Sequence, residues 1–150
     1  MFAVADANLI DCFHYDVAQL WSKNIMQARH FIACAAAVLF LGVACGAFGA
    51  HALKAHLTAD RLAIWQTAVL YQFVHGLGCL AIGVLLEHKS SRYLKLSGWA
   101  MLAGVVLFSG SLYLLALTGV QKLGIITPIG GLMFLLAWLL LGLSVMDKKQ

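Results

Sequence analysis

Four long apolar stretches occupy most of this 150-residue chain. They cover residues 31–53, 62–86, 96–117 and 125–146, and none of them contains an Asp or a Glu. Each exceeds the roughly 20 residues that an α-helix needs to cross about 30 Å of hydrocarbon. Because the three connections are short, neighbouring helices should be antiparallel. The sequence therefore predicts an all-α integral membrane four-helix bundle made of antiparallel up-and-down hairpins.

Composition places the chain in the membrane class. Hydrophobic residues make up 63% of it and charged residues 11%, which is too apolar for a soluble domain. The formal charge is +4, but the Lys and Arg residues lie outside the apolar stretches, where they act as topology signals. We therefore expect the lipid bilayer as a partner and no nucleic acid.

The basic residues lie unevenly on the two sides and predict the orientation. One side carries seven of the ten, namely Lys23, Arg29, Lys89, Arg92, Lys95, Lys148 and Lys149; the other carries Lys54, Arg61 and Lys122. Positively charged flanks are retained in the cytoplasm, so both termini should be cytoplasmic. Residues 50–52 read Ala-His-Ala like a signal-peptide cleavage site, but the preceding apolar run is too long and begins too late for one.

The first thirty residues differ from the rest and form a predicted N-terminal extension, 1–30. Its apolar residues recur at close to helical spacing, which is typical of a short interfacial amphipathic helix. Alternatively, translation starts at Met26, whose basic neighbourhood makes a natural beginning for the first membrane helix; residues 1–25 would then not belong to the protein. Both alternatives stay open. Residues 147–150 form a predicted cytoplasmic tail.

Polar side chains inside the membrane gather on one face of the second segment. At about 100° per residue, Thr67, Tyr71, His75, Cys79 and Gln72 fall within one arc, while the opposite face is lipid-like. The polar arc should face the bundle interior. His75 has two interpretations: a structural histidine that hydrogen-bonds between helices, or a functional group that handles a proton or a ligand.

The third segment has polar groups on two faces, so it should pack on both sides. Ser109 and Tyr113 share one face, and Gly104 and Ser111 share another. Serines within a helix also bond their own preceding turn, which is the competing interpretation of Ser109 and Ser111. The sharpest proposal is one interior hydrogen-bonded cluster of five residues: Tyr71, Gln72, His75, Ser109 and Tyr113.

Small residues and a proline mark further positions. Thr127 is predicted to cap the last helix, with Pro128 at its first position. A non-cytoplasmic cleft is the second candidate site, with His51, Gln66, Thr127 and Pro128 as its residues and the helix start as a place for an anion. Candidate helix-packing positions are Gly42, Gly46, Gly49, Gly104, Gly130 and Gly131.

The sequence contains few residues that could catalyse a reaction. The apolar stretches hold no carboxylate for intramembrane catalysis, and no phosphate-binding loop, zinc-protease motif or nucleophile elbow occurs. The four cysteines show no metal-ligand spacing and read as packing residues. His51 and His75 lie at different depths, which argues against axial haem ligation. We expect no catalytic residue, no metal and no cofactor.

Four motifs in order along the chain resemble the YgdD-like family of small four-helix inner-membrane proteins. They are GAFGAH at 46–51, WQTA at 65–68 followed by Tyr71, Gln72 and His75, FSGSLY at 108–113, and TPIGG at 127–131. The resemblance covers about 26–146 and implies a multi-pass protein of the bacterial inner (plasma) membrane in a family of unknown function. Its motif positions fall on His51, Gln66, Tyr71, Gln72, His75, Ser109, Tyr113, Thr127 and Pro128.

The sequence thus favours a non-enzymatic accessory or structural membrane component whose polar cluster holds the bundle together. The alternative is a small transporter or binding protein for a lipid-like or small polar molecule. A homo-oligomer or a membrane-protein partner is a further expectation, because the glycine-bearing faces can serve contacts between chains as well as within one.

Overall fold

The computed structural model describes residues 4–146, with side chains from residue 25 onward, and this part of the chain contains helices and no strand. Within the described residues, four helical stretches are long and apolar enough to cross a membrane: Ile25–Ala55, Ala59–His88, Arg92–Thr118 and Gln121–Met146. The prediction of an all-α, four-span membrane protein is confirmed. Each span extends beyond its predicted apolar stretch, because polar residues at the ends continue the helix toward the interface.

The elements follow one another along the chain with short connections. They are α1 (Val4–His51), the 3₁₀ turn η1 (Leu53–Ala55), α2 (Ala59–His88), α3 (Arg92–Gly104), the π-helical turn η2 (Val105–Ser109), α4 (Gly110–Thr118), the 3₁₀ turn η3 (Gln121–Ile125) and α5 (Thr127–Met146). The third span is therefore one helix in three parts.

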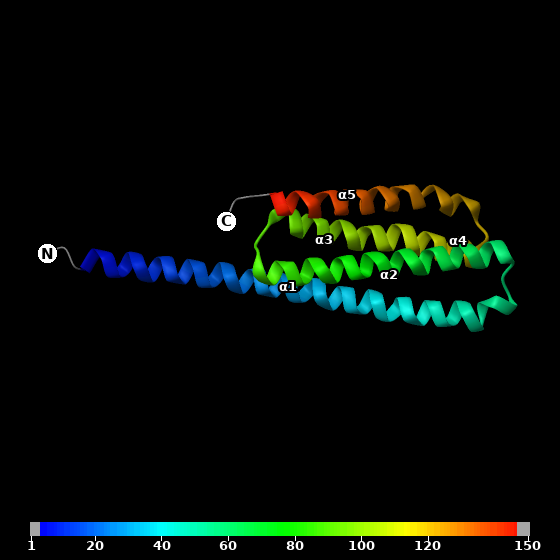
Figure 1. The fold of residues 1–150 in the computed structure, drawn as a ribbon, viewed down its shortest axis with the longest axis horizontal. Helices are drawn as coiled ribbons and strands as arrows, with labels where there is room; N and C mark the ends of the chain where they lie inside the picture. The colour runs from blue at the N-terminus through cyan, green and yellow to red at the C-terminus, as the bar shows by residue number, and fades with distance from the viewer. Residues whose placement is uncertain (1–3, 147–150) are drawn as a thin grey trace.

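The spans lie side by side and alternate in direction (Figure 1). α2 packs against α1 on one side and against α3 and α4 on the other, and α5 packs against α3 and η2. α1 continues well past the end of the bundle toward the N-terminus. Its helix runs unbroken from Val4 into the first span. Both interpretations of residues 1–30 stay predictions, and the predicted tail 147–150 lies outside the described residues.

Helix ends are closed by local polar contacts. Thr58 caps α2 by accepting a hydrogen bond from the Arg61 backbone N–H (3.4 Å). Gly119, the residue that follows α4, has a left-handed φ of +73°, and a side chain there would meet the Arg61 guanidinium. At the other end of the bundle, Lys89 Nζ donates to the carbonyl oxygen of Ser144 (3.0 Å), placing a cation at the C-terminus of α5.

The predicted Thr127 cap is wrong in its details. The Ile126 carbonyl accepts from the Gly130 N–H (3.3 Å), so the helix begins one residue earlier than expected. The Thr127 hydroxyl pairs instead with Ser111 Oγ of α4 (2.9 Å), which anchors the start of α5 to the third span. Pro128 still lies in the first turn, where its missing N–H costs no hydrogen bond.

The π-helical turn η2 changes the face that the third span presents to α2. Met101 and Ser109 both contact α2, Met101 beside Gly78 and Ser109 by a hydrogen bond to Ala68. In an uninterrupted α-helix, residues eight apart would differ by about 80° around the axis. A π turn holds one extra residue, and so brings both side chains to the same side.

The larger of the two buried apolar clusters in the described part of the chain lies near the end of the bundle that holds the α2–α3 connection. Its members include Phe31, Ile82, Leu86, Leu94 and Met101. Large hydrophobic side chains elsewhere, such as Phe40, Val106 and Leu135, are exposed. Exposed apolar side chains along the spans are what a bilayer requires of a protein surface.

Candidate functional site

A hydrogen-bonded chain crosses three helices in the middle of the bundle. Tyr113 Oη of α4 donates to Gln72 Oε1 of α2 (2.6 Å), and Gln72 Nε2 donates to the carbonyl oxygen of Val38 in α1 (2.8 Å). Gln72 is 5% exposed. Its amide thus uses one acceptor and one donor in opposite directions, which fixes its orientation and joins α1, α2 and α4.

Trp65 extends this polar interior toward the α1–α2 turn. Its Nε1 donates to the carbonyl oxygen of Cys45 (2.9 Å), and its ring lies 4.4 Å from that of Tyr113, centroid to centroid. The indole also fills the space beside Gly49, where a Cβ would collide with it. A glycine in α1 is therefore what lets Trp65 reach across to the α1 backbone.

Three serines use their hydroxyls to join the third span to its neighbours. Ser109 Oγ donates to the carbonyl oxygen of Ala68 in α2 (2.9 Å) and Ser97 Oγ to that of Ala137 in α5 (2.7 Å). The Ser111 hydroxyl donates to the carbonyl oxygen of Phe108 in its own span and is also hydrogen-bonded to the Thr127 hydroxyl of α5. Ser109 thus bonds another helix and not its own preceding turn, whereas Ser111 does both.

Tyr71 and His75 lie apart from these bonds, on the side of α2 that approaches α5. His75 Nδ1 donates to the carbonyl oxygen of Tyr71 (2.8 Å). The His75 ring stacks on Phe134 of α5 with centroids 3.3 Å apart and planes 11° apart, and the Tyr71 ring stacks on Phe108 of η2 at 4.4 Å. Four rings from three elements therefore form one aromatic wall.

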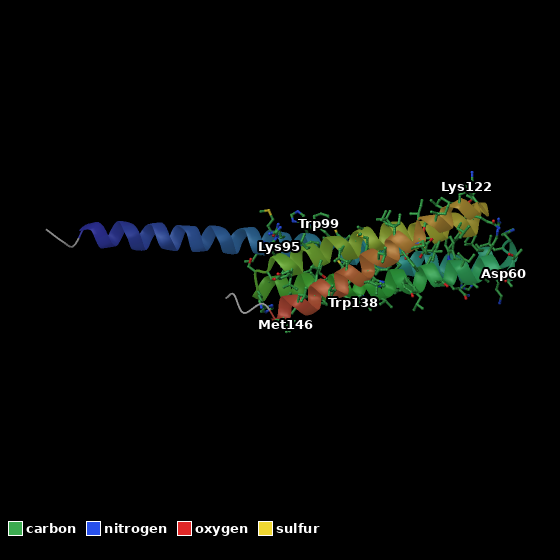
Figure 2. All side chains as sticks on the ribbon, turned by 90° about the horizontal axis from the view of Figure 1, so that it is seen from above. Asp60, Lys95, Trp99, Lys122, Trp138 and Met146 are labelled. Atoms are coloured by element: carbon green, nitrogen blue, oxygen red, sulfur yellow. The ribbon has the colours of Figure 1, made fainter. Side chains whose placement is uncertain are left out.

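That wall lines a groove of about 510 Å³ between α2, η2 and α5. The rest of its lining comes from Pro128, Gly131, Leu132, Leu135 and Trp138. Leu132 and Leu135 are more than half exposed, so the groove opens to the outside of the bundle, where the hydrocarbon lies. Trp138 lies at the edge of the bundle (Figure 2).

Two polar groups of the groove have no partner within the described part of the chain. Among the described residues, Ser91 Oγ, which lies outside the groove, is the one fully buried side-chain polar atom that lacks a hydrogen bond. His75 Nε2 also lacks a partner and is therefore not fully buried. This atom reaches the surface, although the residue as a whole is only 5% exposed. The Tyr71 hydroxyl, on a side chain 38% exposed, makes no hydrogen bond to residues 25–146 either.

The five residues of the predicted interior cluster divide into two groups. Gln72, Ser109 and Tyr113 point between helices and are satisfied there. Tyr71 and His75 line the groove and are joined to the others through the backbone of α2. The structure therefore brings the predicted residues to one level of the bundle without forming a single side-chain network.

The four residues of the predicted non-cytoplasmic cleft are not brought together. His51 is exposed at the end of α1, and Gln66 lines a shallow groove of about 320 Å³ between α1 and α2. Thr127 pairs with Ser111, and Pro128 belongs to the larger groove beside Tyr71. These four residues therefore face different neighbours.

The predicted packing glycines lie at close helix contacts. Gly42, Gly46 and Gly49 face Phe73, Val69 and Trp65 of α2, while Gly104 lies under the Phe134 ring. Gly130 approaches the Phe108 backbone so closely that a Cβ would overlap it, whereas Gly131 leaves ordinary contact distance. Further close contacts of this kind, at Gly76, Gly83 and Gly98, were not predicted from the sequence.

Sequence reasoning also missed the aromatic wall. Phe108, Phe134 and Trp138 sit in apolar stretches where they look like ordinary lipid-facing residues. Only the π turn and the crossing at Gly130 bring Phe108 beside α5.

Residues 25–146 contain no group of three or more His, Cys, Asp or Glu side chains that could hold a metal ion.

Comparison with known proteins places this architecture in a family. Residues 45–131 match the family described as "Protein of unknown function (DUF423)". A UPF0382 membrane protein of Staphylococcus haemolyticus is 47% identical over 114 residues, which is 76% of this chain and 93% of the relative. The UPF0382 membrane protein YwdK of Bacillus subtilis is 41% identical over 112 residues, or 74% and 91%.

No solved structure matches the chain. The matches to the relatives nevertheless cover nearly their whole length. The chain therefore belongs to the DUF423 family of UPF0382 membrane proteins, multi-pass proteins of bacterial membranes whose molecular function is unknown.

Proposed function

We propose that this protein is a non-enzymatic membrane component that binds a lipid-soluble small molecule in the groove between α2, η2 and α5. The observation that carries the proposal is the pair Tyr71 and His75, which keep hydrogen-bonding capacity in a groove whose other lining is apolar. A polar atom facing hydrocarbon without a partner is costly. A ligand that enters from the bilayer and bonds it removes that cost.

The interior hydrogen bonds support a structural role for the remaining polar residues. Gln72, Tyr113, Ser97 and Ser109 spend their polar atoms on neighbouring helices, which stabilises a membrane bundle by an average of roughly 0.6 kcal/mol per bond. The accessory or structural role predicted from the sequence thus concerns these residues. The alternative, a binding protein, concerns the groove, and the unpartnered pair favours it.

Several finer predictions belong to this proposal. The chain would lie in the bacterial inner (plasma) membrane with both termini cytoplasmic, as the distribution of basic residues indicates. The YgdD-like resemblance rests on the four motifs, and a homo-oligomer or a membrane-protein partner stays a prediction.

The test is native mass spectrometry of the protein released from its own membranes. We expect a bound lipophilic mass on the wild type that is lost from Gly131→Leu, because a Cβ at Gly131 has room and points toward the groove-lining Phe108 ring. The control is Gly142→Leu in the same helix, where a Cβ meets nothing within 4 Å. Equal retention by both variants would contradict the proposal.

A further inference from the structure

The tautomer of His75 restricts what the groove can hold. A carbonyl oxygen only accepts hydrogen bonds, so the bond to the Tyr71 carbonyl (2.8 Å) requires the proton of the neutral ring to be on Nδ1. Nε2 is then an acceptor. The ligand that satisfies it must bring a hydrogen-bond donor, which excludes molecules that carry only carbonyl or ether oxygens.

The depth of the site restricts the charge of that donor. His75 lies near the middle of the span Ala59–His88, where a charged group is costly in the bilayer. The groove contains no carboxylate to pair with an ammonium group. A neutral hydroxyl is therefore the donor that fits both the acceptor and its surroundings.

The shape of the wall restricts the body of the ligand. Tyr71, His75, Phe108 and Phe134 present stacked rings, with Trp138 at the margin. Aromatic faces favour another aromatic ring by offset or edge contacts. A volume of about 510 Å³ holds one substituted ring and the first part of a chain, and the exposed side at Leu132 and Leu135 lets the chain continue into lipid.

We infer that the groove is a site for a lipid-soluble phenol or hydroquinone, with a ring hydroxyl donating to His75 Nε2 and the ring lying along the aromatic wall. This inference rests on the proposed function and adds the ligand class. The Tyr71 hydroxyl, as donor or acceptor, is available to a second oxygen of the same ring. The hydroquinone form should therefore bind more tightly than the quinone, which has acceptors only.

The experiment compares three probes of one shape on the full-length protein in detergent. They are decylhydroquinone, decylbenzoquinone and the dimethyl ether of decylhydroquinone, and the readout is the ¹⁵N resonance of His75 Nε2, assigned by its loss in His75→Phe. We expect the hydroquinone alone to shift this resonance, and to bind roughly threefold to tenfold more tightly than the ether.

A matched histidine provides the control. His88 donates from Nδ1 to the carbonyl of Val84 (3.0 Å) on the same helix, outside the groove. His88→Phe should leave hydroquinone affinity unchanged, whereas His75→Phe should reduce it to that of the ether. Because the affinities of the hydroquinone and the ether are both measured on the wild type, that comparison stands even where His75→Phe fails to fold.

The outcomes separate the two levels of the hypothesis. Equal binding of all three probes, abolished by Gly131→Leu, would overturn the ligand class and leave the groove as a binding site. Binding of dodecanol as tight as that of the hydroquinone would overturn the aromatic requirement. No saturable binding of any probe, with no co-purified molecule, would overturn both the ligand class and the proposed function. A wild-type spectrum with the proton on Nε2 would overturn the tautomer argument.

Discussion

Two adjacent glycines of α5 differ in what surrounds them. Gly130 faces the backbone of Phe108 in η2, whereas Gly131 faces the ring of the same residue across ordinary van der Waals distance. The first lets α5 cross the π turn closely, and the second leaves the groove open. The two neighbouring glycines therefore serve two separate purposes in α5.

Gly130→Ala should destabilise the protein by about 1–3 kcal/mol, because the added methyl overlaps backbone that cannot rotate away. Gly131→Ala should be nearly neutral, because its nearest neighbours, two Phe108 ring atoms, are at 3.9 Å. The measurement is unfolding in detergent, with Gly142→Ala as the unhindered control. Equal losses for the two neighbouring substitutions would contradict the close crossing.

Sequence periodicity was enough to place Tyr71, Gln72 and His75 on one arc of a regular helix, but of these three only Gln72 bonds between helices, whereas Tyr71 and His75 line the groove. It could not say which carbonyl each side chain bonds. Ser109 illustrates the limit, since its bond to Ala68 depends on the depth and rotation of another helix. Tyr71 and His75 lie in the groove because their rings face Phe108 of η2 and Phe134 of α5.

The third span is the element whose shape matters most for the site. Its π turn aligns Met101 with Ser109 toward α2 and places Phe108 in the wall of the groove. Nothing in residues 105–108, which read Val-Val-Leu-Phe, distinguishes them from a continuous α-helix. The turn is set by packing on both sides, so the hydrophobic pattern of the sequence carries no signal for it.

Deleting Val106 should therefore be tolerated. This side chain is 70% exposed, and its removal would turn the π turn into α-helix while leaving Met101 and Ser109 seven residues apart, within about 20° of one another. Deleting the exposed Leu77 of α2 is the matched control. It rotates half of an uninterrupted helix by about 100° and should abolish accumulation in the membrane.

The measurement is the amount of folded protein in membranes together with its melting temperature. We expect the Val106 deletion to remain close to the wild type and the Leu77 deletion to be lost. A Val106 deletion as damaging as the Leu77 deletion would show that the third span does not depend on an extra residue at this turn.

At the scale of the whole molecule, the two ends of the bundle differ in composition and connectivity. Asp60 and Lys122 lie at the end with the α1–α2 and α4–α5 connections, and Lys95 and Met146 lie at the other (Figure 2). Hydropathy alone was sufficient to predict the four spans and their alternation, because bilayer thickness imposes their length. The packing order, with α2 between α1 and the third span, depends on contacts that hydropathy does not encode.

The distribution of Lys and Arg predicts which end faces the cytoplasm. A green fluorescent protein fused after Gln150 should fluoresce, and alkaline phosphatase fused after Lys122 should be active. Exchanging the two reporters should silence both. Active phosphatase at Gln150 would reverse the orientation and move Lys89, Arg92 and Lys95 to the outer side.

The central claim, a bilayer-facing groove that holds a lipid-soluble molecule, is tested most directly by photo-crosslinking in intact membranes. A benzophenone amino acid at Leu135, in the groove lining and 68% exposed, is compared with one at Leu139, 60% exposed and outside that lining. We predict one discrete small-molecule adduct at position 135, displaced by decylhydroquinone, and only mixed phospholipid adducts at 139. The same phospholipid mixture at both positions would contradict the claim.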